Sequence, residues 1–406
     1  MPIFGRVLPP VSSPLTLGAL GRGVRTALGG VADGAPEVER QLATRFASSR
    51  IVLTDSGTSA LTLAMQLADA GRNLPVALPA YGCFDLATAA DGAGLRAVLY
   101  DVDPTTLAPN AESLAAALAL APASVVVAHF YGVPVDTRRI RAQVEAAGAL
   151  LIDDAAQGIG ALVDGRPAGL GGALGVLSFG RGKGVTGGGG GALLVPNDSP
   201  CIAQSRALAL TPAAAGWFGS LAKGGAQWLL ARPSLYAIPS SLPFLGLGET
   251  RYHAPHAVTA MPSFALGVLS VTAGLADTEI ATRRAHAERL RRVARDAGWE
   301  VPHLRDGLEP GWLRLPLMLP MSVAPETIPR HLGVTRGYPQ SLADLSGFGE
   351  RTLLPAARYP GARALAARLV TLPTHGQVRE RDLAALERWL RAPQSALPGA
   401  LPGVSR

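Results

Sequence analysis

The stretch from Leu150 to Val195 constrains the fold of this chain of 406 residues more than any other. It begins with an apolar run that ends in two carboxylates, Asp153 and Asp154, and a glycine-rich passage follows. A second apolar run leads through the letters SFGRGK into five consecutive glycines, 187–191. Short apolar runs bounded by turn residues predict buried strands. The stretch therefore predicts buried strands with polar side chains at the points where they end.

Strand-like and helical segments alternate along the chain before this stretch. Strand-like runs lie at 51–53, 76–78, 96–100, 124–128 and 150–153. Helical patterns lie between them, at 36–47, 62–70, up to about 93, 111–120 and 137–147. The runs are apolar on both faces, which is typical of a mostly parallel sheet covered by helices. We therefore predict an α/β fold.

The chain divides into three predicted regions. Residues 1–35 are rich in proline and glycine and are expected to form an arm that lies on another surface. Residues 36–260 form the predicted large domain, with an apolar insertion at about 202–250. Residues 261–406 form a predicted smaller C-terminal α/β domain, with helices expected over about 261–297 and 380–391 and a strand-like segment around 312–318.

Polar residues cluster just after the predicted strands. In sheets of this kind, ligands bind at the carboxyl ends of the strands. The clustering therefore predicts a ligand site, and its candidate residues are Ser56 to Ser59, Tyr81, His129, Asp154, Gln157, Ser178 and Lys183.

Asp154 and Lys183 suit pyridoxal 5'-phosphate (PLP). A lysine amine on a glycine-flanked turn can form a Schiff base with the aldehyde of this cofactor. A carboxylate at a strand end can pair with the pyridinium nitrogen and keep it protonated. Each residue also has a simpler interpretation, because Asp154 could cap a helix and Lys183 could be a solvated lysine. The glycine run is not a P-loop, because the lysine precedes it.

The composition narrows the classes of partner. Hydrophobic residues make up 48% and charged residues 17%, which is typical of a globular protein. The net charge of +7 is scattered, and its densest arginine group, at 283–295, has helical spacing and is interleaved with acids. We interpret that group as a solvated helix face, with a surface for anionic substrates or lipids as the alternative. Aromatic residues are only 5%, so we expect no nucleic-acid platform.

Cellular location follows from the cysteines and from the lack of long apolar runs. Two cysteines, Cys83 and Cys201, are too few for a disulfide framework and fit a reducing cytoplasm. The N-terminal segment is broken by prolines and does not resemble a signal peptide, and no apolar run of about 18 residues predicts a membrane span. The apolar segment 216–246 is predicted to be a buried helix and loop, or alternatively an interfacial segment on a membrane surface.

Taken together and in this order, the motifs resemble the DegT/StrS family of sugar aminotransferases, which are PLP enzymes of the aspartate aminotransferase fold (fold type I). The resemblance covers residues 35–200 and returns at 261–300 and 371–391. The matching motifs are SGTSAL at 56–61, PAY at 79–81, DVD at 101–103, HFYGVPVD at 129–136, DDAAQ at 153–157, SFGRGK at 178–183 and LPTH at 372–375.

The resemblance implies a role for each matching residue. Lys183 would be the Schiff-base lysine and the base that moves the proton, and Asp154 would pair with the pyridinium nitrogen. Gln157 would contact the ring hydroxyl. The phosphate would be held by Gly57, Thr58 and Ser178, with Ser59 near it.

The motifs leave two candidates for the residue that covers the face of the cofactor ring. The position of the family's usual stacking aromatic falls on Cys83, with Phe84 beside it, and either could cover the ring. His129 would line the cofactor pocket, or would be a buried histidine with its hydrogen bonds satisfied.

Two further positions depart from the family pattern. Gly189 stands where the family usually has an acid, and the family's Asn-x-Arg-Met segment is here Val258-Thr-Ala-Met261. That segment normally carries a contact to the partner subunit's phosphate. Arg181, two residues before the lysine, could supply positive charge instead.

The resemblance implies transfer of an amino group from an amino acid, glutamate by family habit, to a keto sugar that is usually nucleotide-linked. It also implies a homodimer. One alternative is a PLP-dependent sugar dehydratase, although that branch carries a histidine where this chain has Lys183. A second is a PLP-binding regulator without turnover, which the altered 258–261 segment motivates. A nucleotide-binding protein that uses the glycine run is the weakest alternative.

Overall fold

The computed structural model describes residues 6–29, 34–47, 50–213, 217–237, 251–320, 327–354 and 358–392. Its centre is a sheet of seven strands in the order β1-β9-β8-β5-β4-β2-β3. The bounds, in that order, are Arg50–Thr54, Gly191–Val195, Leu174–Ser178, Leu150–Asp154, Ser124–Ala128, Val76–Pro79 and Ala97–Tyr100. β9 runs antiparallel to both of its neighbours, and the other paired strands are parallel. The predicted mostly parallel sheet is confirmed.

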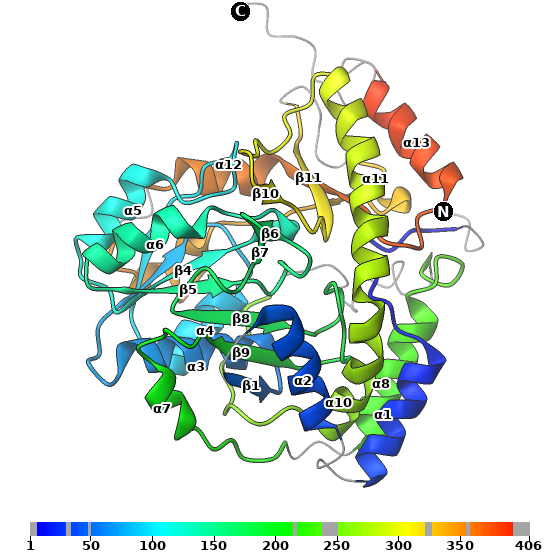
Figure 1. Cartoon of the computed structure of the whole chain (residues 1–406). Coiled ribbons are helices and arrows are strands. Elements are labelled where there is room, and N and C mark those ends of the chain that lie inside the picture. Colours follow the sequence, from blue (N-terminus) through cyan, green and yellow to red (C-terminus); the bar gives the residue numbers. More distant parts are fainter. Residues whose placement is uncertain are drawn as a thin grey trace, which may run out of the picture.

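Helices cover both faces of this sheet (Figure 1). One face packs against α3 (Gly57–Asp69) and α4 (Asp85–Ala93), and the other against α2 (Ala35–Phe46), α5 (Ala111–Leu118) and α6 (Thr137–Ala146). Side chains alternate between the two faces along each strand. In β2, Val76 and Leu78 join the core under α3, whereas Ala77 joins the core under α5 and α6. This alternation explains why the strands read as continuous apolar runs.

The C-terminal half adds a long helix and two small sheets. α10 (Ser263–Thr272) continues through a 3-10 turn (Ala273–Leu275) into α11 (Ala276–Asp296), which agrees with the predicted helix over 261–297. An antiparallel sheet has the order β11 (Arg314–Met318), β13 (Leu369–Pro373), β12 (Thr335–Arg336). The remaining elements are β6 (Leu162–Val163), β7 (Arg166–Pro167), β10 (Leu308–Glu309), α7 (Ile202–Arg206), α12 (Pro360–Arg368) and α13 (Glu380–Arg391).

The N-terminal arm lies on its own chain. α1 (Leu17–Gly29) packs against α10 and α8 (Trp217–Leu230), and the three helices lie together at one side of the molecule (Figure 1). Before α1, the Arg6 guanidinium bonds Asp382 of α13, with an N–O distance of 2.8 Å. The predicted surface under the arm is therefore, for residues 6–29, the rest of the same protein. The predicted domain boundary at 260 stays a prediction.

The predicted apolar insertion is partly accounted for by α8. Leu221 and Trp228 of this helix pack against the small core formed by α1 and α10, whereas the side chain of Phe218 stays exposed. Residues 238–250 of the insertion lie outside the described residues. Membrane contact by this segment stays a prediction.

One helix among the described residues, 263–296, has the length and composition of a membrane span. Its most apolar window of 18 residues has a mean hydropathy of 1.4, and half of that window is buried inside the protein. The buried part packs against α1, α2 and α8. Core packing therefore accounts for the apolar composition of this helix.

Candidate active site

A cavity opens where the central strands of the sheet end. The strand registers place Ala128 and Asp154, at the ends of β4 and β5, beside Val176 within β8, and all three line the cavity. The cavity has about 540 Å³ of empty space, part of it open to solvent. Eight residues singled out in the sequence line it, namely Gly57, Thr58, Cys83, His129, Asp154, Gln157, Ser178 and Lys183.

The N-terminus of α3 forms one end of the cavity. Ser56 caps the helix, and its hydroxyl accepts a hydrogen bond of 3.0 Å from the Ser59 N–H. A side-chain carbon on Gly57 would lie 2.6 Å from Cβ of Ser178, so glycine is required for this close approach. Exposed N–H groups at a helix N-terminus attract anions. This end of the cavity, with the Ser178 hydroxyl beside it, therefore suits a phosphate group.

Asp154 lies on the wall of the cavity as the last residue of β5. Burial raises the pKa of its carboxyl above the ordinary value, while a hydrogen bond from the Ala156 N–H and the charge of Lys183 act to lower it. A carboxylate held in a poorly solvated place is stabilised by a cationic partner. Asp154 is therefore suited to face a protonated ring nitrogen.

The neighbouring Asp153 has a different environment because successive side chains of a strand point to opposite faces. It is fully buried, and its Oδ2 accepts hydrogen bonds from the N–H groups of Gly169 and Gly171, at 2.9 and 2.7 Å. Its Oδ1 lies 2.5 Å from Nε2 of His129. These bonds saturate Asp153, which leaves Asp154 as the carboxylate at the cavity.

His129 is a buried histidine with its hydrogen bonds satisfied, and its place beside a cofactor stays a prediction. It lines the cavity, and both of its ring nitrogens are bonded. Nδ1 accepts a hydrogen bond of 3.0 Å from the Val135 N–H, so the ring proton lies on Nε2 and is donated to Asp153. The pair Asp153–His129 thus fixes the orientation of the imidazole beside Asp154.

Lys183 is held on a turn that the N-terminal arm covers. Gly182 within this turn has φ +79°, a backbone conformation that favours glycine. The Ser13 hydroxyl donates a hydrogen bond of 2.8 Å to the Lys183 carbonyl, and Val11 contacts Gly182. The arm therefore supports the backbone from which the Lys183 amine reaches the cavity.

Five predicted residues lie outside the cavity lining, namely Ser56, Ser59, Tyr81, Phe84 and Arg181. The Ser59 hydroxyl is 2.9 Å from that of Ser56 and belongs to the helix cap. Phe84, the residue before α4, is buried in the core and does not line the cavity. Arg181 is exposed, and its charge acts on Tyr236. Of the two candidates for the ring face, only Cys83 reaches the cavity.

Cys83 is a neutral thiol in this environment. Its Sγ lies 3.2 Å from Oδ2 of Asp85, which also lines the cavity. Burial, together with the Asp85 charge, raises the pKa of Cys83 to about 12. Because the thiolate is the reactive form of cysteine, Cys83 contributes shape and a weak donor rather than a nucleophile.

Sequence reasoning missed Asp85 and Tyr338, the two further polar side chains that line the cavity. Asp85 could have been found, since it follows Cys83 by two residues at a predicted strand end. Tyr338 comes from a loop of the C-terminal half, and none of the matching motifs includes it. The other unpredicted lining residues are the apolar Leu61, Leu86, Ala128, Phe130, Ala156 and Val176.

Residues 32–212 match the model of the DegT/DnrJ/EryC1/StrS aminotransferase family. This part of the chain is therefore similar to that family. All seven strands of the central sheet, and every lining residue named above except Tyr338, fall within the matched residues. The resemblance inferred from the motifs is thereby confirmed.

Two curated proteins illustrate the relatives that this chain resembles. L-glutamine:2-deoxy-scyllo-inosose aminotransferase of Streptomyces kanamyceticus is 33% identical over 50% of this chain and 49% of its own length. dTDP-4-dehydro-2,3,6-trideoxy-D-glucose 4-aminotransferase of Saccharopolyspora spinosa is 35% identical over 32% of this chain and 34% of its own. The chain thus spans at most about half the length of these two relatives.

Solved structures extend the likeness of fold over nearly the whole chain. The sugar aminotransferase CalS13 of Micromonospora echinospora superposes with a TM-score of 0.69 and 22% identity, over 95% of this chain and 99% of its own. At this identity the likeness concerns the fold. The chain has the fold type I architecture, as predicted.

Proposed function

We propose that this protein is a PLP-dependent aminotransferase that moves an amino group from an amino acid to a keto sugar or a related polyhydroxylated cyclic ketone. The observation that carries the proposal is the arrangement of one cavity. It has a helix N-terminus at one end, and Asp154 and the single cavity lysine, Lys183, line it. The names of both relatives, which act on an inosose and on a dTDP-linked keto sugar, support the acceptor class.

The residues present fit PLP as the cofactor. The phosphate would lie at the N–H groups of Gly57 and Thr58 and at the Ser178 hydroxyl, where a side-chain carbon on Gly57 would close the space. Asp154 would face the ring nitrogen. When bound, PLP supplies an electron sink for the negative charge that develops on the substrate carbon.

The chain's own groups would supply the proton transfers. Nζ of Lys183 would take the proton from the α-carbon of the amino donor and return it on the other side of the C–N bond, as a positioned base does. The Asp154 carboxylate would keep a proton on the ring nitrogen. The Asp153–His129 pair would hold the imidazole against this wall, while the apolar lining restricts water.

The amino donor divides into two candidates. The family resemblance implies glutamate, whereas the name of one relative specifies L-glutamine. The acceptor would be a keto sugar, nucleotide-linked or free, and the protein would act as a homodimer in the cytoplasm. A monomeric mass by light scattering of the holoenzyme would contradict the dimer.

The donor half-reaction tests the proposed function directly. The PLP-loaded protein is mixed with L-glutamate or L-glutamine while its visible absorbance and the released 2-oxo acid are followed. We expect the visible band of bound PLP to fall as stoichiometric 2-oxo acid appears. A band that no amino donor changes would contradict the proposal and would favour the non-catalytic regulator.

A further inference from the structure

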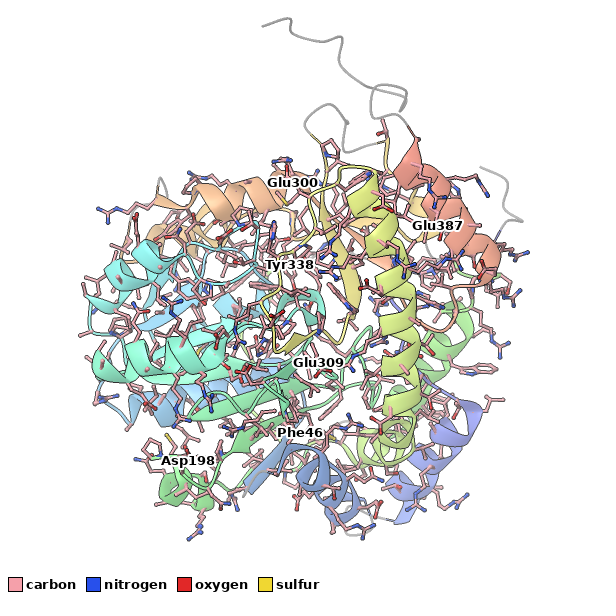
Figure 2. The ribbon with its side chains drawn as sticks, turned by 45° about the horizontal axis from the view of Figure 1, so that its top comes forward. Phe46, Asp198, Glu300, Glu309, Tyr338 and Glu387 are labelled. Carbon is pink, nitrogen blue, oxygen red and sulfur yellow. The ribbon has the colours of Figure 1, made fainter. Side chains whose placement is uncertain are left out.

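Tyr338 reaches the cavity from the C-terminal half of the chain. It lies between β12 and a 3-10 turn (Leu342–Asp344), near the middle of the molecule, whereas Asp198 and Glu387 lie toward its periphery (Figure 2). Its ring stacks on that of Tyr131, with centroids 5.8 Å apart, and meets the ring of Tyr81 edge to face at 5.3 Å. These contacts hold the phenol in one orientation.

Hydrogen-bond direction at Gln157 determines what the Tyr338 hydroxyl can do. The Gln157 Oε1 accepts a hydrogen bond of 2.8 Å from the Tyr131 N–H, which can only donate. The other end of the amide is therefore the NH₂ group, and it donates to the Tyr338 hydroxyl oxygen at 2.5 Å. The Tyr338 oxygen is thus an acceptor toward Gln157, and its own proton remains available.

The hydroxyl proton of Tyr338 is available to a bound molecule. Burial raises the pKa of Tyr338 well above its ordinary value, so the phenol keeps its proton. Within the part of the chain that the structure describes, the hydroxyl has Gln157 as its hydrogen-bond partner and no acceptor for this proton. Because Tyr338 lines the cavity, an oxygen of a bound molecule is the acceptor that this geometry suits.

Asp85 offers the complementary group. One of its carboxylate oxygens, Oδ2, accepts from the Cys83 thiol, and the other has no partner among the described residues. Asp85 and Tyr338 both line this cavity. The lining therefore offers a donor and an acceptor, as a molecule with adjacent hydroxyl groups requires.

The charge of the lining restricts which part of a substrate enters. Lys183 is the one cation among the residues that the structure describes in this lining, and no arginine accompanies it. Asp85 would repel a phosphate placed next to it. The charge of this lining favours an uncharged ring over a phosphate beside Asp85.

We propose that Tyr338 and Asp85 bind the ring hydroxyls of the acceptor: Tyr338 donates to one hydroxyl oxygen, and Asp85 accepts from a neighbouring hydroxyl. This inference rests on the proposed aminotransferase function. It makes the two residues determinants of acceptor specificity, with no part in the reaction of the amino donor.

The test compares full-length holoenzymes carrying Tyr338→Phe or Asp85→Asn. The acceptors are scyllo-inosose, a dTDP-linked 4-keto sugar and, as the ketone without hydroxyls, cyclohexanone. Tyr359→Phe is the matched control, because it removes the hydroxyl of a buried tyrosine that bonds the Leu99 carbonyl and does not line the cavity. Thermal unfolding of each variant establishes that it is folded.

We expect Tyr338→Phe to raise KM for the hydroxylated ketones about 5- to 10-fold, the effect of one neutral hydrogen bond. Asp85→Asn should raise it about 10- to 100-fold, since a charged acceptor is lost. The kcat values, the reaction with cyclohexanone and the rate of the donor half-reaction should stay unchanged, and Tyr359→Phe should behave as the wild type.

Two results would overturn the inference and leave the proposed function standing. One is an unchanged KM for the hydroxylated ketones in both variants, and the other is a wild type that does not prefer any hydroxylated ketone over cyclohexanone. A donor half-reaction that slows in Tyr338→Phe would also overturn it, since the residue would then act on the donor or cofactor. A wild type without any donor half-reaction would remove the proposed function itself.

Discussion

The two sides of the cavity are built in different ways. The side at the strand ends comes from one compact stretch of sequence, and backbone register positions it: Ala128, Asp154 and Val176 are paired across β4, β5 and β8. The second side comprises Asp85, at the start of α4, and Tyr338, more than half the chain away. The first side carries the proposed cofactor chemistry, and the second faces the proposed acceptor. A fold can keep the first side constant while the second varies.

Replacing Lys183 should have the largest effect on the rate of amino transfer, and it tests the proposed role of the strand-end side of the cavity. Lys183→Ala should lower the rate of amino transfer by at least about a thousandfold, because the base that moves the proton is gone. The chain has two lysines, and the other, Lys223, is exposed on α8. Lys223→Ala is therefore the control and should retain the wild-type rate. Steady-state assays measure the rate of amino transfer in both variants.

The two adjacent aspartates should separate activity from stability. Asp153→Asn should lower the free energy of unfolding by about 2–3 kcal/mol, because the carboxylate accepts two backbone N–H bonds and the histidine bond in the core. Asp154→Asn should instead lower kcat by about 100-fold or more while the fold is kept. Urea denaturation and turnover, measured on both variants, check this. Equal losses of stability in the two would contradict the assignment.

The pH dependence of the free energy of unfolding of the apoprotein tests the environment of Asp154. Burial raises the folded-state pKa of Asp154, so the folded state binds more protons than the unfolded state just above the ordinary value of 3.8. This group therefore costs stability as the pH rises through that range, and the cost persists at neutral pH. Asp154→Asn should make the cofactor-free protein equal to or more stable than the wild type at pH 7, with the difference vanishing below about pH 4. A variant that is less stable at pH 7 than at pH 4, relative to wild type, would contradict this.

A smaller effect is expected at the phosphate end. Gly57→Ala places a carbon 2.6 Å from Cβ of Ser178, and such overpacking costs about 1–3 kcal/mol. The dissociation constant for PLP should rise by about tenfold or more. Gly189→Ala is the matched control, since its added carbon meets nothing within 4 Å and its φ is not in the left-handed region. Absorbance titration of the apoprotein measures both constants.

The smallest expected effect concerns Cys83. Its pKa of about 12 predicts that iodoacetamide modifies it at least about tenfold more slowly than a free cysteine at pH 8. Cys83→Ser should then leave the donor half-reaction nearly unchanged. Rapid alkylation at pH 8, located by peptide mass spectrometry, would show instead that the thiolate is accessible.

The contrast between the two sides also explains what could be predicted from the sequence. Continuous apolar runs, which suit strands buried on both faces, indicated the parallel sheet. Polar residues at the ends of these runs indicated the cavity, because the carboxyl ends of parallel strands meet at one edge. Local turn chemistry decided the finer points. Cys83 and Phe84 are consecutive, and the apolar pattern does not distinguish Cys83, which lines the cavity, from Phe84, which is buried in the core.

Tyr338 could not have been found in the same way. It belongs to no periodic segment. Its position depends on Gly337, because a Cβ atom added to that glycine would lie 2.2 Å from the Tyr81 hydroxyl. Such a contact joins residues far apart in sequence and has no local signature. The course of the N-terminal arm along its own chain, through Ser13 and Arg6, likewise depends on tertiary contacts.

Borohydride trapping identifies the lysine that carries the cofactor. The PLP-loaded protein is reduced, digested and examined by mass spectrometry for the peptide that carries the cofactor. We predict that the cofactor mass is found on Lys183 and that Lys223 remains unmodified, with Lys183→Ala abolishing the label. A label on Lys223, or no label on a protein saturated with PLP, would contradict the assignment of this cavity as the cofactor site.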